Sequence, residues 1–431
     1  MSIRITAWAG FLAMAGLFSA LGQTRPAPRE KSPEPAAASP ESDDAYRQIE
    51  QLSRVVELIR TNYVDGSKVS YEKLVASALE GMLKELDPHS QFMRPETYQR
   101  MQQEQANTYE GVGITISGRG EGITIVTVRE DGPAARAGVM PGDLLIKIGD
   151  AMVDSGGVME ASQLLRGKPG EPLKLTVQRP STREFREFEM VRQVISTTTV
   201  KDSMLLDPSL SGDFKIGYLR LLQFTQPTAN ELVVALDKLE DQGMQALVLD
   251  LRNNPGGLIT SAVDVAGEFL PPGTTVVTTE GRDGQSKGPA FKTPDRKRRK
   301  REYPLVVLVN HSSASGAELV AGALQDLHRA VIVGETTFGK GSVQSIIPVD
   351  GGCAVRLTTA KYFTPSHRTI HEQGIKPNIV ASLTPDEEKQ LMEFWRRGET
   401  VTSDALHLSR LGDRQLERAA TALKGVLALQ K

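Results

Sequence analysis

The sequence predicts an α/β core joined to a smaller β domain, with helical regions at both ends of the chain. Three observations carry this prediction. Beyond Val200, short apolar runs such as Ala246–Leu251 alternate with helical patterns, which is typical of strands and helices that alternate in one sheet. Around Glu110 the pattern changes to apolar and polar residues in strict alternation, as in half-buried strands. Before residue 90 and after Pro385, apolar residues recur at helical spacing.

The N-terminal segment, residues 1–22, has the pattern of a secretory signal peptide. Arg4 precedes a mostly apolar stretch, Ile5–Phe18, which is short for a membrane span, and Ala20-Leu21-Gly22 forms a small-x-small cleavage pattern. We therefore expect export to the periplasm or another extracytoplasmic compartment, with membrane association if the segment stays uncleaved. Residues 23–45, rich in Pro, Ala, Ser and Glu, are predicted to be a disordered linker. Residues 46–95 are predicted to be an N-terminal helical region.

Residues 96–190 are predicted to form a β domain that resembles a PDZ domain. A glycine-rich segment, Gly111-Val112-Gly113-Ile114, precedes alternating strands, a helical stretch at Val158–Leu165 and a further strand at Leu173–Gln178. Glycines let successive backbone N–H groups turn toward a C-terminal carboxylate, and the strand that follows can pair with an extended peptide. A small β domain without a ligand is the alternative.

Two short segments of the core predict a serine nucleophile and a lysine base. Ser315 lies in the small-residue turn His311–Glu318, between an apolar run and a helical pattern. Backbone N–H groups at a helix N-terminus favour developing negative charge there. Lys340 stands between Gly339 and Gly341, just before a predicted strand. Because a desolvated lysine can take the proton of a serine, the pair indicates a Ser/Lys hydrolase.

The same residues are also compatible with a helix cap, a phosphate-binding loop or a histidine-based triad. Ser312, Ser313 and Ser315 could each cap the helix. Only Ser315 stands immediately before the predicted helix with a small residue on each side, which leaves its hydroxyl accessible. The segment 334–341 nearly matches a phosphate-binding loop, yet Gly341 stands where that motif requires Ser or Thr. His311 directly follows the predicted strand, so we expect it to line the turn rather than to act in a triad.

Composition excludes several classes of function. The formal net charge of −2 gives no reason to expect a nucleic-acid partner, and the basic run at residues 296–301 is interpreted as a solvated linker. Cys353 is the single cysteine, which excludes an intrachain disulfide, and it is expected to be a core or strand residue. The histidines of the chain are scattered and do not have the spacing of metal ligands. We therefore expect no metal and no cofactor.

Taken together, the motifs resemble the carboxy-terminal processing peptidases, tail-specific Ser/Lys proteases with an inserted PDZ domain. The matching segments lie between about Tyr46 and about Val380, and are Leu86–Ser90, the PDZ series, Leu249–Gly257, Ser313–Ser315 and Gly339–Gln344. The resemblance implies a ClpP/crotonase-like α/β protease core over residues 191–384 and a C-terminal helical region over residues 385–431. Gly316 departs from the family pattern, which usually has Ala there, and Ala317 stands where Ser is common.

Carried onto this sequence, the family pattern makes Ser315 the nucleophile and Lys340 its base. Gln344 is implied to hold the lysine in place. The oxyanion is expected to be bound by the backbone N–H of Gly316 and by one N–H from Gly256 or Gly257, since glycines allow close approach.

The sequence thus predicts an exported serine endopeptidase that binds proteins or peptides with free apolar C-termini and cleaves them near that end. Arg166, at the end of the helix flanking the peptide groove, either complements the helix dipole or contacts the protease body and reports PDZ occupancy. The terminal helices resemble the family's dimerisation regions, which implies a homo-oligomer, and an adaptor protein is left open as a partner. A catalytically silent PDZ scaffold is the alternative function.

Overall fold

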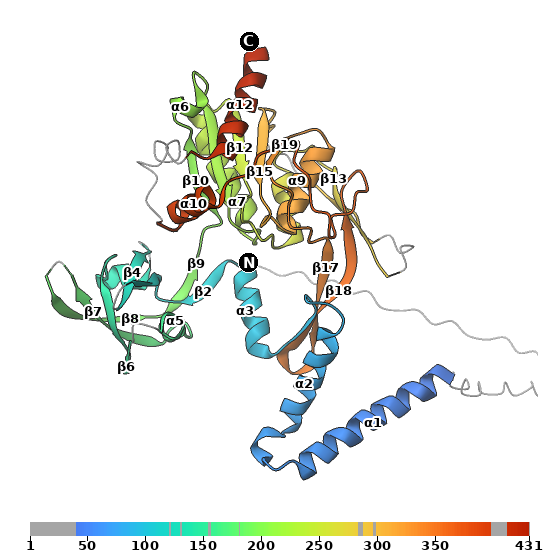
Figure 1. Cartoon of the computed structure of the whole chain (residues 1–431). Helices are drawn as coiled ribbons and strands as arrows, with labels where there is room; N and C mark the ends of the chain where they lie inside the picture. Colours follow the sequence, from blue (N-terminus) through green and yellow to red (C-terminus); the bar gives the residue numbers. More distant parts are fainter. Residues whose placement is uncertain are drawn as a thin grey trace, which may run out of the picture. The chain divides into compact units, whose positions relative to one another are not determined.

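The computed structural model describes residues 40–119, 122–129, 132–153, 157–180, 182–282, 288–295, 299–397 and 412–430 (Figure 1). The predicted signal peptide and most of the predicted linker lie outside these residues. The chain divides into two compact units, Met1–Val75 and Ala76–Lys431. Within the described residues, no helix is both long enough and apolar enough to cross a membrane.

The described part of the first unit is helical. Helix α1, Pro40–Asn62, begins inside the predicted linker and is followed by the short 3-10 helix η1, Gly66–Lys68, and by the start of α2, Tyr71–Lys84. Asp65 caps η1 by accepting a hydrogen bond from the Ser67 N–H at 3.1 Å. Apolar side chains on α1 recur every three or four residues and are exposed: Tyr46, Ile49, Leu52, Val55, Leu58 and Ile59.

The second unit is built on a six-stranded sheet, as the alternating pattern predicts. Its strands, in spatial order, are β10 (Val200–Leu205), β11 (Ile216–Leu221), β12 (Ala246–Asp250), β15 (Leu305–Val309), β16 (Val331–Gly334) and β19 (Ile379–Val380). From β11 to β19 the strands are parallel, and β10 pairs with β11 antiparallel at one edge. Every residue of β11, β12 and β15 is buried, which explains their continuous apolar runs.

Helices cover both faces of this sheet. Successive residues of a strand belong to two different apolar clusters, one on each face: Val248 lies in one cluster and Leu249 in the other. The first cluster includes side chains of α7 (Thr228–Asp241), α8 (Ile259–Ala266) and α9 (Gly316–Asp326). The second is closed by α6 (Pro208–Ser211) and α12 (Arg414–Leu429), while α10 (Pro385–Arg397) adds Phe394 at its margin. Each fully buried Leu or Val contributes about 1.5–3 kcal/mol to stability.

A second sheet joins a strand before the β domain to strands of the core. Its strands are β1 (Gln91–Met93), β18 (Cys353–Phe363), β13 (Thr275–Glu280), β14 (Phe291–Lys292) and β17 (Ser342–Val349), with η2 (Asp350–Gly352) connecting β17 to β18. The pairing of β1 with β18 ties the segment before the β domain to the core. Cys353 begins β18, so its prediction as a strand residue is confirmed.

The β domain lies between α3 (Pro95–Gln105) and β10. It is entered by β2 (Thr108–Gly111), which pairs with β9 (Gln193–Ser196). Its own sheet has the order β3-β4-β5-β7-β8, with β6 on β5, formed by Ile114–Arg119, Gly122–Val128, Leu144–Ile148, Pro172–Arg179, Glu184–Val191 and, for β6, Ala151–Met152. Helices α4 (Pro133–Ala137) and α5 (Val158–Leu165) complete it. Asp143 and Arg179 form a buried bidentate ion pair, with both hydrogen bonds at 2.9 Å.

The basic run corrects one prediction. Arg301 is not part of a solvated linker, because it is buried and pairs with Asp237 at 2.7 Å, Glu240 at 2.8 Å and Glu268 at 2.6 Å. These carboxylates lie on α7 and just after α8, and together they offset the desolvation of the guanidinium. Arg299 also pairs with Glu240, and residues 296–298 lie outside the described residues.

Candidate active site

Ser315, Lys340 and the two glycines predicted to bind the oxyanion lie in loops that follow three neighbouring parallel strands. The loop after β12 carries Gly256 and Gly257, the loop after β15 carries Ser315, and the loop after β16 carries Lys340. Because β12, β15 and β16 are parallel and adjacent, their carboxyl ends meet at one edge of the sheet, where α/β folds bind their ligands. The fold therefore brings together segments that are far apart in the sequence.

Ser315 has a strained backbone at the start of α9. It is the N-cap residue of this helix, with φ 51° and ψ −114°, a region that side-chain-bearing residues rarely occupy. A sharp, strained turn from strand to helix that exposes a serine is also the geometry of the nucleophile in other hydrolases. The turn is held because the Ala314 N–H donates to the Asn254 carbonyl at 2.9 Å. This backbone geometry supports Ser315 as the nucleophile.

Ser313 has a different place in the structure. Its side chain is fully buried, and its hydroxyl donates to the Leu251 carbonyl at 2.8 Å while accepting from the Asn310 N–H at 3.0 Å. The bond to Leu251 joins the loop after β12 to the loop after β15. His311 lies at the surface, with its ring nitrogens 3.4 Å from Glu335 and 3.8 Å from Glu388.

Glu318 is a functional candidate that the sequence analysis missed. This fully buried carboxylate accepts four hydrogen bonds, from the N–H groups of Ser315 (2.8 Å), Gly339 (2.7 Å) and Lys340 (2.9 Å) and from the Thr337 hydroxyl (2.6 Å). The donors Ser315 and Lys340 share one oxygen, Oε2. Burial raises the pKa of Glu318, and these hydrogen bonds oppose the rise. The Ser-x-x-Glu spacing of a capping box was the available signal.

Lys340 is half-buried beside other cationic or titratable groups. Burial lowers the pKa of its amine, the Arg356 guanidinium lowers it further, and the Glu318 carboxylate opposes both. His89, from the segment before β1, also interacts with the lysine: burial and the Lys340 charge lower the pKa of this imidazole. Among the described residues, no hydrogen bond joins Lys340 Nζ to Ser315 Oγ, as is common in ligand-free active sites.

Gln344 lies on β17, close to the lysine in sequence, with its side-chain amide directed elsewhere. The amide donates to Ser342 Oγ at 2.8 Å, and within the described part of the chain no hydrogen bond joins it to Lys340. The strand has a register shift between Val343 and Gln344.

The two glycines of the loop after β12 have different roles. The Gly256 N–H donates to Asn254 Oδ1 at 2.8 Å, so it is already used. Within the residues described, the N–H groups of Gly257 and Gly316 have no hydrogen-bond acceptor. A Cβ on Gly256 would lie 2.7 Å from the Gly316 nitrogen, and one on Gly257 would lie 2.0 Å from the Phe224 carbonyl oxygen. Only glycine therefore fits at either position, and this loop lies directly against the serine turn.

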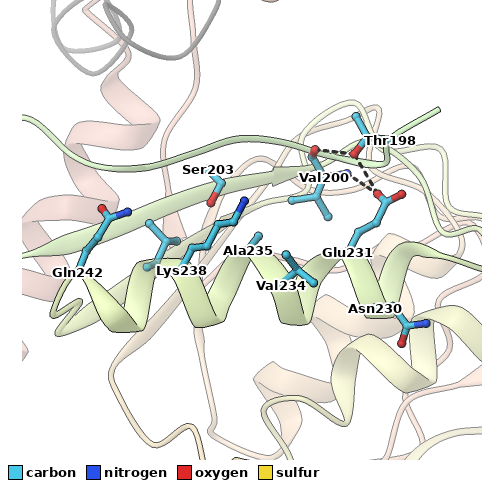
Figure 2. Close-up of a pocket in the computed structure, with 10 residues that line it drawn as sticks. Thr198, Val200, Ser203, Asn230, Glu231, Val234, Ala235, Lys238 and Gln242 are labelled. Atoms are coloured by element: carbon cyan, nitrogen blue, oxygen red, sulfur yellow. Dashed lines mark hydrogen bonds between the residues drawn. The ribbon is translucent and has the colours of Figure 1, made fainter. Parts of the chain in front are cut away.

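A groove elsewhere on the core contains none of the predicted catalytic residues. It has a volume of about 490 Å³ and lies between β10 and α7, lined by Val200, Val234 and Lys238 among others (Figure 2). Glu231 also lines the groove and accepts a hydrogen bond from the Thr198 hydroxyl at 3.0 Å (Figure 2). The Thr199 hydroxyl donates to the same carboxylate at 2.9 Å.

Comparison with known proteins identifies the family. The model of peptidase family S41 matches residues 215–381, the PDZ domain model matches residues 124–179, and the activating protease CtpB N-terminal domain model matches residues 11–97. A carboxy-terminal-processing protease from Bartonella bacilliformis is 39% identical over 343 residues, which cover 78% of this chain and 76% of that protein. The chain belongs to the carboxy-terminal processing proteases of family S41.

Other members of the family cover similar shares of the chain. The carboxy-terminal processing protease CtpB of Bacillus subtilis is 32% identical over 91% of this chain and 78% of that protein. The related CtpA of the same organism is 35% identical over 79% of this chain and 70% of that protein. A solved photosystem II D1 C-terminal processing protease is 28% identical and covers 77% of this chain and 92% of that one, with a TM-score of 0.45. The protein is a C-terminal processing serine endopeptidase, which confirms the predicted enzyme class over the silent scaffold.

In this carboxy-terminal processing protease, the predicted carboxylate loop lies between β2 and β3. Val112 is buried, Gly113 has a positive φ of 82°, and Ile114 begins β3, the edge strand of the PDZ sheet. Gly111 lies close to the Tyr109 ring: a Cβ added at Gly111 would lie 3.1 Å from a carbon of that ring. Arg166 ends α5, and its guanidinium lies 5.9 Å from the centre of the same ring. The arginine therefore contacts the strand that leads into the domain.

Proposed function

We propose that this protein is an exported endopeptidase in which Ser315 and Lys340 form the catalytic dyad. The observation that carries the proposal is the shared carboxylate of Glu318: its Oε2 lies within hydrogen-bond distance of the backbone nitrogens of both residues, at 2.8 and 2.9 Å. A single buried group thereby ties the backbone of the nucleophile to the backbone of the base.

The lysine acts as a base when it is neutral. Its lowered pKa, caused by burial and by Arg356, favours the free amine over the ammonium form. The amine takes the proton of Ser315 Oγ as the oxygen attacks the substrate carbonyl. The resulting ammonium then donates that proton to the departing amine as the peptide bond breaks. Lys340 next takes a proton from the water that attacks the acyl-enzyme. The lysine then returns this proton to Ser315 Oγ as the acyl bond breaks and the new carboxyl group is released.

The oxyanion of each tetrahedral intermediate is bound by the N–H groups of Gly316 and Gly257. Both donors lie at the serine turn without an acceptor among the described residues, whereas the N–H of Gly256 is occupied by Asn254. The Gly316 N–H also belongs to the first turn of α9, where the helix dipole favours negative charge. Gln344, bonded to Ser342, is proposed to hold the lysine side chain once Lys340 Nζ turns toward Ser315 Oγ.

The PDZ domain selects the substrate by its end. The backbone N–H groups of the segment Gly111–Ile114 bind the terminal carboxylate, and the tail adds as a strand beside β3, the edge strand of the described PDZ sheet, next to α5. Arg166, stacked near Tyr109 on the entering strand, is placed to sense the bound tail. Tail binding would then shift a resting enzyme toward the active arrangement.

Export and assembly complete the proposal. The apolar stretch Ile5–Phe18 supports secretion across a membrane, with the catalytic chain outside the cytoplasm. The exposed apolar side chains of α1 support pairing with a second copy of the chain. An adaptor protein is compatible with a PDZ-gated enzyme, and no described residue points to one.

The dyad is tested with single substitutions and a covalent probe. Ser315→Ala and Lys340→Ala should each lower kcat by at least about a thousandfold with the fold retained, and the double variant should be little worse than either. Fluorophosphonate should label the wild-type protein and Ser312→Ala, but not Ser315→Ala. Labelling of Ser315→Ala at the wild-type rate, or full turnover by Lys340→Ala, would disprove the assignment.

A further inference from the structure

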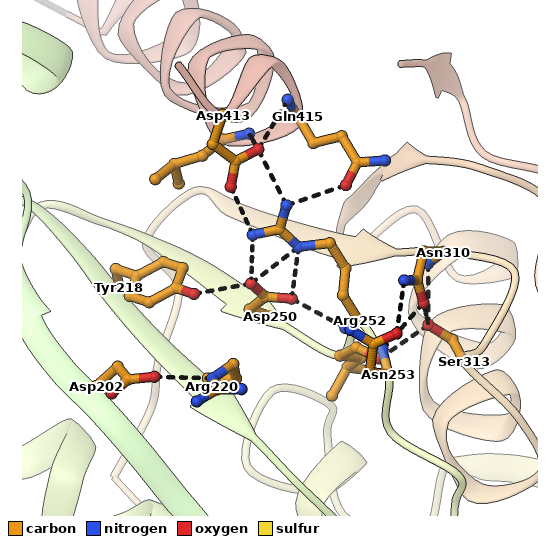
Figure 3. Close-up of polar contacts among 12 residues, drawn as sticks. Asp202, Tyr218, Arg220, Asp250, Arg252, Asn253, Asn310, Ser313, Asp413 and Gln415 are labelled. Carbon is orange, nitrogen blue, oxygen red and sulfur yellow. Dashed lines mark hydrogen bonds and ion pairs between the residues drawn. The ribbon is translucent and has the colours of Figure 1, made fainter. Parts of the chain in front are cut away.

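The arginine at the start of the oxyanion loop is held by the C-terminal end of the chain. Arg252 follows β12, is fully buried, and donates through Nε to both oxygens of Asp250 at 3.0 Å (Figure 3). Its remaining nitrogens bind Asp413 at 3.0 and 2.8 Å and Gln415 at 3.0 Å. Asp413 and Gln415 lie at the N-terminus of α12, more than 150 residues further along the chain.

Helix α12 is well placed to act as a fixed support. Asp413 caps it by accepting hydrogen bonds from the N–H groups of Gln415 and Leu416, both at 3.1 Å. Its apolar face, with Leu416, Leu423 and Leu427, packs into the cluster beneath the central sheet. The Gln415 amide also donates to the Ala381 carbonyl at 2.8 Å. The N-terminal end of α12, which contacts Arg252, is therefore held by its cap, by the apolar packing of the helix and by the bond to Ala381.

Helix α10 contacts the same arginine. The Trp395 ring lies 5.3 Å from the Arg252 guanidinium and 4.4 Å from that of Arg220. Asn253, the next residue of the loop, donates to the Met392 sulfur at 3.3 Å. The loop after β12 thus has the C-terminal helices on one side.

The other side of this loop is the oxyanion site. Asn253 has a positive φ of 56° and exchanges hydrogen bonds with Asn310, at 2.9 Å in each direction. A short stretch further along, Gly256 lies against the Gly316 nitrogen, and the Gly257 N–H has no acceptor in the part of the chain that the structure describes. A displacement of Arg252 would therefore be passed to the donors that bind the oxyanion.

We propose that Asp413 and Gln415 are positioning residues for catalysis, which clamp Arg252 and so hold the Gly256–Gly257 loop in its oxyanion-binding geometry. The C-terminal helices would then be a working part of the protease rather than a separate appendage. This inference rests on the proposed oxyanion role of Gly257. An oxyanion site is sensitive to such support, because shifts of about 1 Å lower rates about a hundredfold.

The test compares substitutions in full-length protein with a short peptide substrate. Asp413→Ala should lower kcat about a hundredfold, and Asp413→Asn and Gln415→Ala about tenfold, with KM within about threefold of wild type. Asn is as good an N-cap residue as Asp, so Asp413→Asn retains the helix while it removes the charge and one of the two accepting oxygens that face Arg252. The rate of fluorophosphonate labelling should fall in parallel with kcat.

Leu423→Ala is the matched control, because it weakens the packing of α12 and leaves the contacts to Arg252 in place. If it lowers the thermal midpoint as much as Asp413→Ala does but keeps kcat near the wild-type value, the clamp is supported. Equal losses of kcat in the two variants, or an unchanged kcat in Asp413→Asn and Gln415→Ala, would overturn it. A wild-type protein that fluorophosphonate fails to label would instead count against the proposed dyad.

Discussion

Replacing Glu318 with glutamine removes the charge between the nucleophile and the base while keeping the shape of the side chain. The carboxylate binds two donors on each oxygen: Ser315 and Lys340 on Oε2, and Thr337 and Gly339 on Oε1. An amide has one accepting oxygen, so its NH₂ group must face one of these pairs. The Thr337 hydroxyl can turn to accept from the NH₂ group, whereas a backbone N–H cannot. The amide oxygen should therefore stay with Ser315 and Lys340.

The expected effects follow from this orientation. Glu318→Gln leaves the Gly339 N–H without an acceptor, which costs about 1–3 kcal/mol of unfolding free energy. Glu318→Ala orphans all four donors and opens a cavity, so its loss should exceed about 4 kcal/mol. Because Glu318 raises the pKa of Lys340, the neutral amide should lower that pKa further. In Glu318→Gln the rising limb of kcat/KM should consequently move to lower pH.

The assay measures kcat/KM from mildly acidic to alkaline pH, together with unfolding in urea. Glu268→Gln is the control, since it neutralises another buried carboxylate, in the Arg301 cluster, away from the dyad. It should destabilise the protein without moving the pH profile. A limb that stays in place or moves to higher pH in Glu318→Gln, or full activity in Glu318→Ala, would refute the role assigned to this carboxylate.

Three further predictions follow from the site. Lys340 must be neutral to act, so kcat/KM of the wild-type enzyme should rise with pH through the lowered pKa of this lysine and then level off. Because the pKa of Lys340 is lower in the folded than in the unfolded state, the stability linked to this group is present at high pH and is lost as pH falls through the folded-state pKa. Lys340→Met should therefore raise the thermal midpoint most at neutral and acid pH. Gly257→Ala places a Cβ 2.0 Å from the Phe224 carbonyl and should lower kcat by about a hundredfold or more, measured on folded protein checked by circular dichroism. Amidating the C-terminus of a peptide substrate should slow cleavage sharply, and Arg166→Ala should lower turnover more than tail affinity measured by calorimetry; equal cleavage of acid and amide peptides would leave the PDZ domain as a passive tether.

Local sequence patterns determined much of the fold. Strands β11, β12 and β15 are buried on both faces, so their apolar runs are continuous and can be recognised without knowing the neighbours. The ordered elements of the PDZ domain were also visible in the sequence, and a family model matches residues 124–179 of that segment. Ser315 and Lys340 stand out because both lie in short glycine-containing turns next to apolar strands. Their catalytic roles stay predictions, although the geometry of the turn supports them.

Tertiary structure alone decided how those turns are held. The burial of Ser313, the occupied N–H of Gly256 and the positive φ of Ser315 depend on backbone positions that no local pattern specifies. Glu318 reaches the lysine loop only because β15 and β16 are adjacent in the sheet. Arg252 meets Asp413, and Arg301 meets three carboxylates, through contacts between segments far apart in the chain. Such charges look solvent-exposed in the sequence, because a buried charge is recognisable only from the partners that compensate its desolvation.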